Sequence, residues 1–151
     1  MAMVKRLLSP GGLWYHEGLA LVRVTTGILM IYHGYEVFMG DKMDGYNQWL
    51  TDLKFPSPAF MAYLGKGAEL VGGILLTLGL FTRLAAILLA ITMAVVCFGM
   101  GDGKFLTNDQ HPFLFVLISL LFFFTGAGKY SLDSLFFNNT NPGKHEMDKV
   151  R

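Results

Sequence analysis

The sequence is poor in charge, and this shortage indicates the class of protein. Charged residues make up 15% of its 151 residues, against about 25% in a typical soluble domain. Apolar residues make up 53%, and the mean hydropathy is +0.46. A soluble domain of this size would need more charge to cover its surface, and so would a disordered chain to stay unfolded. The composition therefore predicts an integral membrane protein.

Cysteine is nearly absent as well. The single residue, Cys97, excludes an intramolecular disulfide, a CxxC redox pair and a thiolate metal cluster built by this chain alone. A formal net charge of +1 gives no sign of a nucleic-acid-binding surface. The loop 99–104 is rich in glycine, but Phe98 stands where a phosphate-binding loop requires glycine. We therefore expect no metal site, no intrinsic cofactor and no nucleic-acid partner.

Long uncharged stretches predict an all-α fold that crosses the bilayer. Residues 84–100 form a run of 17 without charge and 111–128 a run of 18, each close to the ~20 residues that a spanning helix needs. Two further stretches carry few charges, and the expected spanning helices are 19–38, 57–80, 83–100 and 111–127. The result is a four-helix transmembrane bundle in a single domain, 1–137, followed by a polar cytoplasmic tail, 138–151.

The connection between the first two helices, 41–58, mixes charged and aromatic residues, which is typical of a short helix lying in the membrane interface. The distribution of lysine and arginine gives the orientation. With the N-terminus inside, seven of the 12 flank the inner ends of the helices, three flank the outer ends and two lie within spans. Because cytoplasmic loops are enriched in these residues, both termini are predicted to be cytoplasmic.

Ionisable side chains inside the expected spans form a candidate site, because such residues are costly in lipid and normally face the bundle interior. The members of this polar cluster are Arg23, His33, Glu36, Lys66, Glu69 and His111. A helical rise of ~1.5 Å per residue places Glu69 and His33 at similar depth, with Arg23 about 10 Å nearer the cytoplasm. Glu69 could pair with Lys66, Arg23 or His33 in a purely structural network. The cluster could instead bind a quinone headgroup, relay protons, or hold a haem between His33 and His111.

Two further sets of residues accompany this cluster. Aromatic residues near the outer rim could line a ligand pocket or belong to the interfacial belt: Tyr32, Trp49 and Tyr63. Small residues recur on the helix faces at spacings that let backbones approach closely: Gly27, Gly34, Gly65, Gly72 and Gly79. The same small-residue faces could serve a homo-oligomer.

Several short motifs in fixed order resemble the DoxX family of small bacterial membrane proteins. They span about residues 18–135 and read RVTTG from 23, YHG from 32, ELVGG from 69, LGLFTRLAA from 78 and GAGKYSLD from 126. The resemblance implies a four-helix bundle in the bacterial inner (plasma) membrane. It also implies a role as a subunit of a quinone-linked oxidoreductase or of an oxidative-stress membrane complex.

Three functions stay open at this stage. The first is a subunit, not catalytic alone, of a quinone-associated redox complex, with quinone as the one cofactor and with other membrane or redox subunits and the lipid bilayer as partners. The second is a membrane scaffold or assembly factor whose buried polar cluster is purely structural. The third is a small proton-coupled transporter that uses Glu69. The sequence contains no complete catalytic constellation, so whether the protein is an enzyme stays open.

Overall fold

The computed structural model describes residues 14–137, and within this range the chain is helical without strands. In chain order the elements are α2 (Tyr15–Gly34), the 3₁₀ turn η1 (Tyr35–Phe38), α3 (Gly40–Asp52), α4 (Pro58–Leu78), α5 (Thr82–Ala94), the π-helical turn η2 (Val95–Met100), α6 (Gln110–Thr125) and α7 (Leu132–Phe137). The predicted tail, 138–151, lies outside the described residues, as do residues 1–13.

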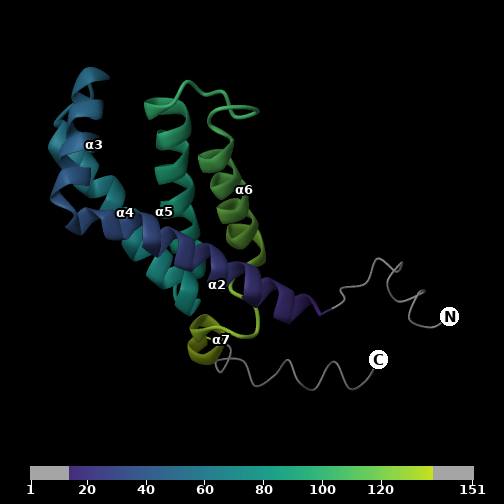
Figure 1. Ribbon diagram of the computed structural model, residues 1–151. Helices are drawn as coiled ribbons and strands as arrows, with labels where there is room; N and C mark the ends of the chain where they lie inside the picture. The colour runs from purple at the N-terminus through teal and green to yellow at the C-terminus, as the bar shows by residue number, and fades with distance from the viewer. Residues whose placement is uncertain (1–13, 138–151) are drawn as a thin grey trace, which may run out of the picture.

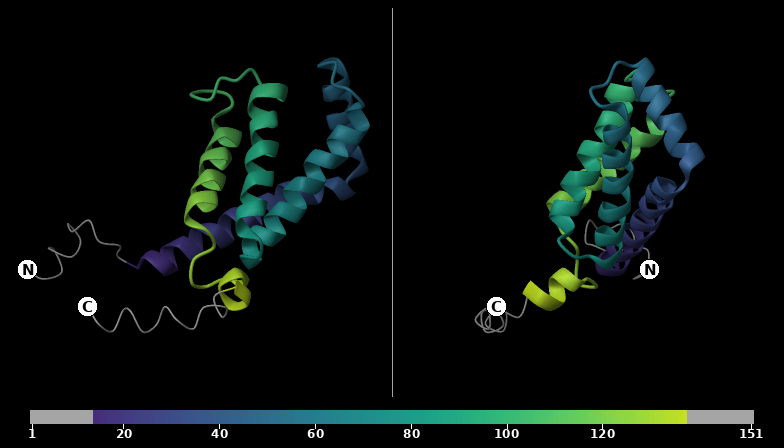
Figure 2. Two further views of the ribbon diagram at one scale, coloured as in Figure 1. Left: turned by 180° about the vertical axis from the view of Figure 1, so that it is seen from behind. Right: turned by 90° about the vertical axis from the view of Figure 1, so that its left-hand side faces the viewer.

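The helices are not all parallel. α5 and α6 lie side by side and run in opposite directions, whereas α2 passes obliquely across the lower part of the molecule (Figures 1 and 2). α2 packs chiefly against α4, α4 also contacts α5, and α5 packs against α6. The core runs along these contacts and centres on four fully buried side chains, Met30, Leu76, Leu89 and Phe122.

The all-α class is confirmed, and two helical stretches are both long and apolar enough to cross a membrane. They are Pro58–Leu78, with 21 residues, and Thr82–Met100, with 19. The sequence predicted four such helices. α6 is apolar but has only 16 residues, and the 20 residues of α2 include the charged side chains of Glu17 and Arg23, which lower its hydropathy.

Glycines bring α2 and α4 into direct backbone contact. A Cβ atom added to Gly73 would lie 2.7 Å from the backbone nitrogen of Ile31 and 2.8 Å from the carbonyl oxygen of Gly27. A Cβ atom on Gly27 would in turn lie 2.7 Å from the backbone nitrogen of Thr77. Two helices that touch at glycines can cross closely with their backbones against each other, and this contact positions the oblique α2.

The predicted packing glycines have different roles in the fold. Gly34 faces the backbone of Leu70, and Gly72 faces the side chain of Leu89 in α5. Gly65 has no neighbouring atom within 4 Å of an added Cβ and lines a cavity instead. Gly79 ends α4 with φ of 66°, a left-handed conformation that glycine adopts without steric cost. The spacing of small residues alone did not distinguish these roles.

The predicted helix between the first two spans is α3, and it packs against α4. Met43 and Leu50 on one face of α3 are buried together with Ala62 of α4 in a small apolar cluster. The spacing of these two residues, seven apart, places them on the same face of the helix. α3 therefore covers the upper end of α4 in Figure 1 and becomes one wall of the site described below.

The start of α5 is capped by a side chain from the far end of the chain. The backbone N–H of Phe81 donates to Asp133 Oδ1 at 2.7 Å, and that of Thr82 donates to Asp133 Oδ2 at 2.9 Å. A carboxylate at a helix N-terminus satisfies amide groups that have no partner within the helix. Asp133 thus fastens α7 to the start of α5.

Asp133→Ala is expected to lower the free energy of unfolding by about 1–2 kcal/mol, the usual cost of losing an N-terminal cap. Thermal unfolding in detergent would measure the change. Asp102→Ala removes a carboxylate from an exposed pair with Lys104 and is expected to change stability by less than about 0.5 kcal/mol. Equal stability of the two variants would contradict the capping role of Asp133.

Candidate functional site

A cavity of about 440 Å³ lies in the upper half of the molecule as drawn in Figure 1, enclosed by α2, α3, α4, the α5–η2 helix and the start of α6. We call it the upper cavity. Its walls are mainly apolar and include Met30, Leu50 and Phe55. The polar and amphipathic side chains in its lining are His33, Tyr46, Trp49, Lys66, Glu69, Thr92 and His111. This is an apolar chamber with a few polar groups, the usual composition of a small-molecule site.

Lys66 sits between two carboxylates at this cavity. Its Nζ lies 3.0 Å from Glu36 Oε2 and 3.0 Å from Glu69 Oε2. The hydroxyl of Tyr46 donates to Glu36 Oε2 at 2.6 Å, and the Lys66 Nζ lies 4.5 Å from the centroid of the Tyr46 ring. Lys66 and Glu69 share a face of α4 because they are three residues apart. The network therefore ties together α4, α3 and the η1 turn.

The network is buried most deeply at its α4 end. The side chains of Glu69, Lys66 and Glu36 are 5%, 11% and 19% exposed. Two carboxylates and one ammonium leave one excess negative charge, and the exposed Lys42 approaches Glu36 Oε1 at 4.0 Å from the rim. Burial and the hydrogen bond to Glu36 raise the pKa of Tyr46, so its hydroxyl remains a donor at neutral pH.

Two histidines from different helices meet at the cavity. The ring centroids of His33 in α2 and His111 in α6 are 5.6 Å apart with an angle of 64° between the planes, and Phe115 packs against both. Within residues 14–137 neither imidazole has a hydrogen-bond partner, so their ring nitrogens are available to a bound molecule. The edge contact between the rings leaves no room for a porphyrin plane between them, which argues against a haem held by this pair.

The structure brings most of the predicted cluster together. Four of its members line the upper cavity: His33, Lys66, Glu69 and His111. Glu36 is not in the lining and contacts Lys66, which is also the partner of Glu69. Of the three aromatic candidates, Trp49 lines the cavity. Tyr32 and Tyr63 are 74% and 54% exposed and are not in the lining.

Sequence reasoning missed Tyr46 as a member of the site. The signal was present in the spacing of α3, because Met43, Tyr46 and Leu50 fall on one face of a helix. The two apolar residues are buried and carry the tyrosine toward the cavity. A helix treated only as an interfacial segment gave no reason to look for a hydrogen-bond donor on its inner face.

Arg23 does not join this cluster and lies at the opposite end of the molecule. Its side chain is buried, and Nη2 donates to the carbonyl oxygen of Tyr130 at 2.6 Å. The Tyr130 hydroxyl donates to Glu17 Oε1 at 3.2 Å, and this contact raises the pKa of Tyr130. Arg23 therefore joins α2 to the segment after α6, a partner 107 positions away that local sequence spacing does not reveal.

No group of three or more His, Cys, Asp or Glu side chains is placed to hold a metal ion in the part of the chain that the structure describes. Cys97 is fully buried in η2, and its Sγ lies 3.8 Å from the carbonyl oxygen of Asp109. A buried thiol of this kind behaves as a small packed side chain.

The model of the DoxX family matches residues 18–102. Over 131 residues, 85% of this chain and 94% of the relative, the sequence is 34% identical to a Bacillus subtilis (strain 168) protein named "Putative oxidoreductase CatD". Two Haemophilus influenzae (strain ATCC 51907 / DSM 11121 / KW20 / Rd) proteins named "Uncharacterized protein" are 34% and 30% identical, covering 79% and 72% of this chain and 90% and 80% of their own lengths. No solved structure matches.

Proposed function

The chain belongs to the DoxX family, and from this premise we propose that it is the quinone-binding membrane subunit of a redox assembly, with the upper cavity as the quinone site. The observation that carries the proposal is an apolar cavity that has two unpartnered imidazoles and a fixed ammonium in its wall. The chain works with partner subunits that carry the redox centre.

In the proposed arrangement α2, α4, α5–η2 and α6 all cross the inner membrane, and both termini are cytoplasmic. The exposed surface of the two candidate spans supports this arrangement, because only 33% of each span is buried against the rest of the molecule. The remaining apolar surface would be costly in water and is suited to lipid. The upper cavity then lies in the outer half of the membrane.

The size and donors of the upper cavity fit a quinone headgroup. Its volume of about 440 Å³ falls within the ~300–1,000 Å³ usual for small-molecule pockets. A quinone carbonyl oxygen accepts hydrogen bonds, which the imidazoles of His33 and His111 and the ammonium of Lys66 can donate. The apolar walls suit the ring and the start of an isoprenoid tail. A bound quinone would supply the electron-carrying group, and the side chains of this chain would orient its carbonyls and exclude water.

The redox role draws on one relative that is named an oxidoreductase. In this proposal the redox centre belongs to a partner subunit, which exchanges electrons with the quinone site. The chain's own contribution is to bind the quinone at a defined depth and to dock the partner.

Quinone titration of the purified protein tests this function. In a Trp14→Phe background, Trp49 at the cavity becomes the single tryptophan, and a short-tailed ubiquinone analogue is expected to quench its fluorescence. His33→Phe and His111→Phe should each weaken binding about tenfold, the value of about one hydrogen bond to a neutral acceptor. Tyr32→Phe, at an exposed residue outside the lining, is the matched control and should bind as the parent does.

Protein that retains no quinone on gentle purification and shows no quenching on titration would exclude the proposed site. The scaffold function would then explain the network around Lys66 as a purely structural device. Equal binding by the parent and both histidine variants would exclude the upper cavity while leaving quinone binding elsewhere on the chain.

A further inference from the structure

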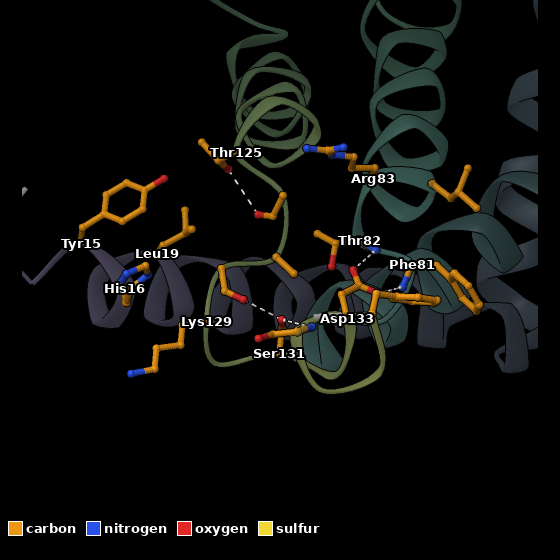
Figure 3. A pocket seen from close by; sticks show the side chains of 16 residues that line it. Tyr15, His16, Leu19, Phe81, Thr82, Arg83, Thr125, Lys129, Ser131 and Asp133 are labelled. Carbon is orange, nitrogen blue, oxygen red and sulfur yellow. Dashed lines mark hydrogen bonds between the residues drawn. The ribbon is translucent and has the colours of Figure 1, made fainter. Parts of the chain in front are cut away.

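A second cavity, of about 760 Å³, lies at the end of the molecule opposite the upper cavity. It is lined by the start of α2, the start of α5, the segment that joins α6 to α7, and α7 itself (Figure 3). We call it the lower cavity. None of the functional roles discussed so far uses it. Its lining includes His16 and Leu19 from α2, Thr82 and Arg83 from α5, and Lys129 from the segment after α6.

The charge of the lower cavity is positive. Arg83 and Lys129 both line it and lie on different sides of it, with His16 on the side of Lys129 (Figure 3). Neither Arg83 nor Lys129 forms a salt bridge with any described residue. The one acidic residue in the lining, Asp133, is held by the backbone N–H groups at the start of α5. Two exposed cations and one carboxylate that is already engaged therefore leave the lining with a net positive charge.

Buried donors without partners gather at the same place. The hydroxyl of Thr82, a lining residue that is 0% exposed, has no hydrogen-bond partner among residues 14–137, and neither do Nε and Nη1 of Arg23. Arg23 is not in the lining but lies close to Ser131, which is, since both side chains come within 2.6 Å of a Cβ atom added to Gly79. No described carboxylate forms a salt bridge with Arg23, and Asp133, which acts on it electrostatically, is held by the start of α5. Because a buried guanidinium without a salt bridge is costly, an anion in the lower cavity would add favourable negative charge near it.

The apolar rim of the lower cavity favours an anion that carries acyl chains over a free anion. Leu19, Phe81 and Leu84 line it beside the cations, and Phe81 and Leu84 are exposed. Tyr15 lies beside Leu19 in the same lining (Figure 3). Amphipathic aromatic residues are typical of the membrane–water boundary. An anion that carries acyl chains would use both the cations and this rim. Free phosphate would use only the cations.

We propose that the lower cavity binds the phosphate headgroup of an anionic phospholipid, with Arg83 and Lys129 on its oxygens and the acyl chains along Leu19 and Leu84. Basic pockets between helices at the cytoplasmic face bind such headgroups in membrane proteins. The site depends on the proposed membrane arrangement and not on quinone binding. Occupation would hold α2, α5 and the segment after α6 together at this end of the molecule.

Native mass spectrometry of the full-length protein in mixed micelles tests the site. Phosphatidylglycerol is expected to bind as one molecule per chain in preference to phosphatidylcholine. The double variant Arg83→Gln/Lys129→Gln should weaken phosphatidylglycerol binding about 30-fold, the effect of removing two cations near an anionic headgroup. The matched control Lys54→Gln/Lys104→Gln removes the same charge from exposed positions outside the lower cavity and should bind as the wild type does.

Equal binding of the two lipids by the wild type would overturn the proposal, as would equal binding of phosphatidylglycerol by the two double variants. Displacement of phosphatidylglycerol by millimolar inorganic phosphate would show that the site binds a free anion, and it would overturn the proposal of a lipid site. If the Arg83/Lys129 variant fails to fold, Thr82→Val must still weaken binding of phosphatidylglycerol. Selective lipid binding by protein that takes up no quinone would support this site while excluding the proposed function.

Discussion

Lys66→Met is expected to lower the free energy of unfolding by about 3–5 kcal/mol, the cost of leaving buried charge without its partner. The ammonium of Lys66 lies 3.0 Å from a carboxylate oxygen of Glu36 and 3.0 Å from one of Glu69. Without it the two carboxylates remain together, and the side chain of Glu69 is only 5% exposed. Methionine keeps most of the length and apolar stem of lysine, so the change reports on charge. Thermal unfolding in detergent should show a fall in Tm of about 10 °C.

Two comparisons separate this effect from the general loss of a lysine. Lys104→Met removes the cation of an exposed pair with Asp102 and should change the free energy of unfolding by no more than about 0.5 kcal/mol. Adding Glu36→Gln and Glu69→Gln to Lys66→Met should restore at least half of the lost stability, because the uncompensated charges are then gone. A Lys66→Met protein as stable as Lys104→Met would show that the buried network does not hold the helices.

The positions of the long helices followed from the sequence because lipid imposes a simple requirement. The expected helices at 57–80 and 83–100 lie at Pro58–Leu78 and Thr82–Met100, the two stretches that qualify as candidate spans. Charge is costly in hydrocarbon, so runs without charge locate spans within a few residues. The oblique orientation of α2 could not be predicted in the same way. It depends on which glycines of α2 and α4 touch, and the spacing of small residues along a helix is the same whether or not that face contacts another helix.

The sequence also did not predict which buried polar residues contact one another. Depth along the helices put Arg23 about 10 Å nearer the cytoplasm than Glu69, but it still left Arg23, Lys66 and His33 as candidate partners. The structure pairs Glu69 with Lys66. The contact of Arg23 with Tyr130 required the path of the chain after α6. Contacts between residues far apart in sequence depend on how helices rotate and cross, and a single sequence contains no direct record of either.

Gly73→Ala is expected to destabilise the protein by at least about 3 kcal/mol, because the added methyl group has no space. A Cβ atom there would lie 2.7 Å from the nitrogen of Ile31, 2.8 Å from the oxygen of Gly27 and 3.0 Å from the carbonyl carbon of Met30. All three are backbone atoms of α2, so no side chain can rotate away. The variant can fold only if α2 moves away from α4, which would loosen the contact that positions His33 at the upper cavity.

Gly67→Ala is the matched control on the same helix. An added Cβ at Gly67 meets nothing within 4 Å, and alanine in a helix interior is favoured over glycine by about 0.5–1 kcal/mol. Thermal unfolding in detergent should therefore place the two alanine variants on opposite sides of the wild type, about 4 kcal/mol apart. If Gly73→Ala is as stable as Gly67→Ala, the two backbones are not in contact, and the oblique α2 must be held by the Arg23 end of the molecule instead.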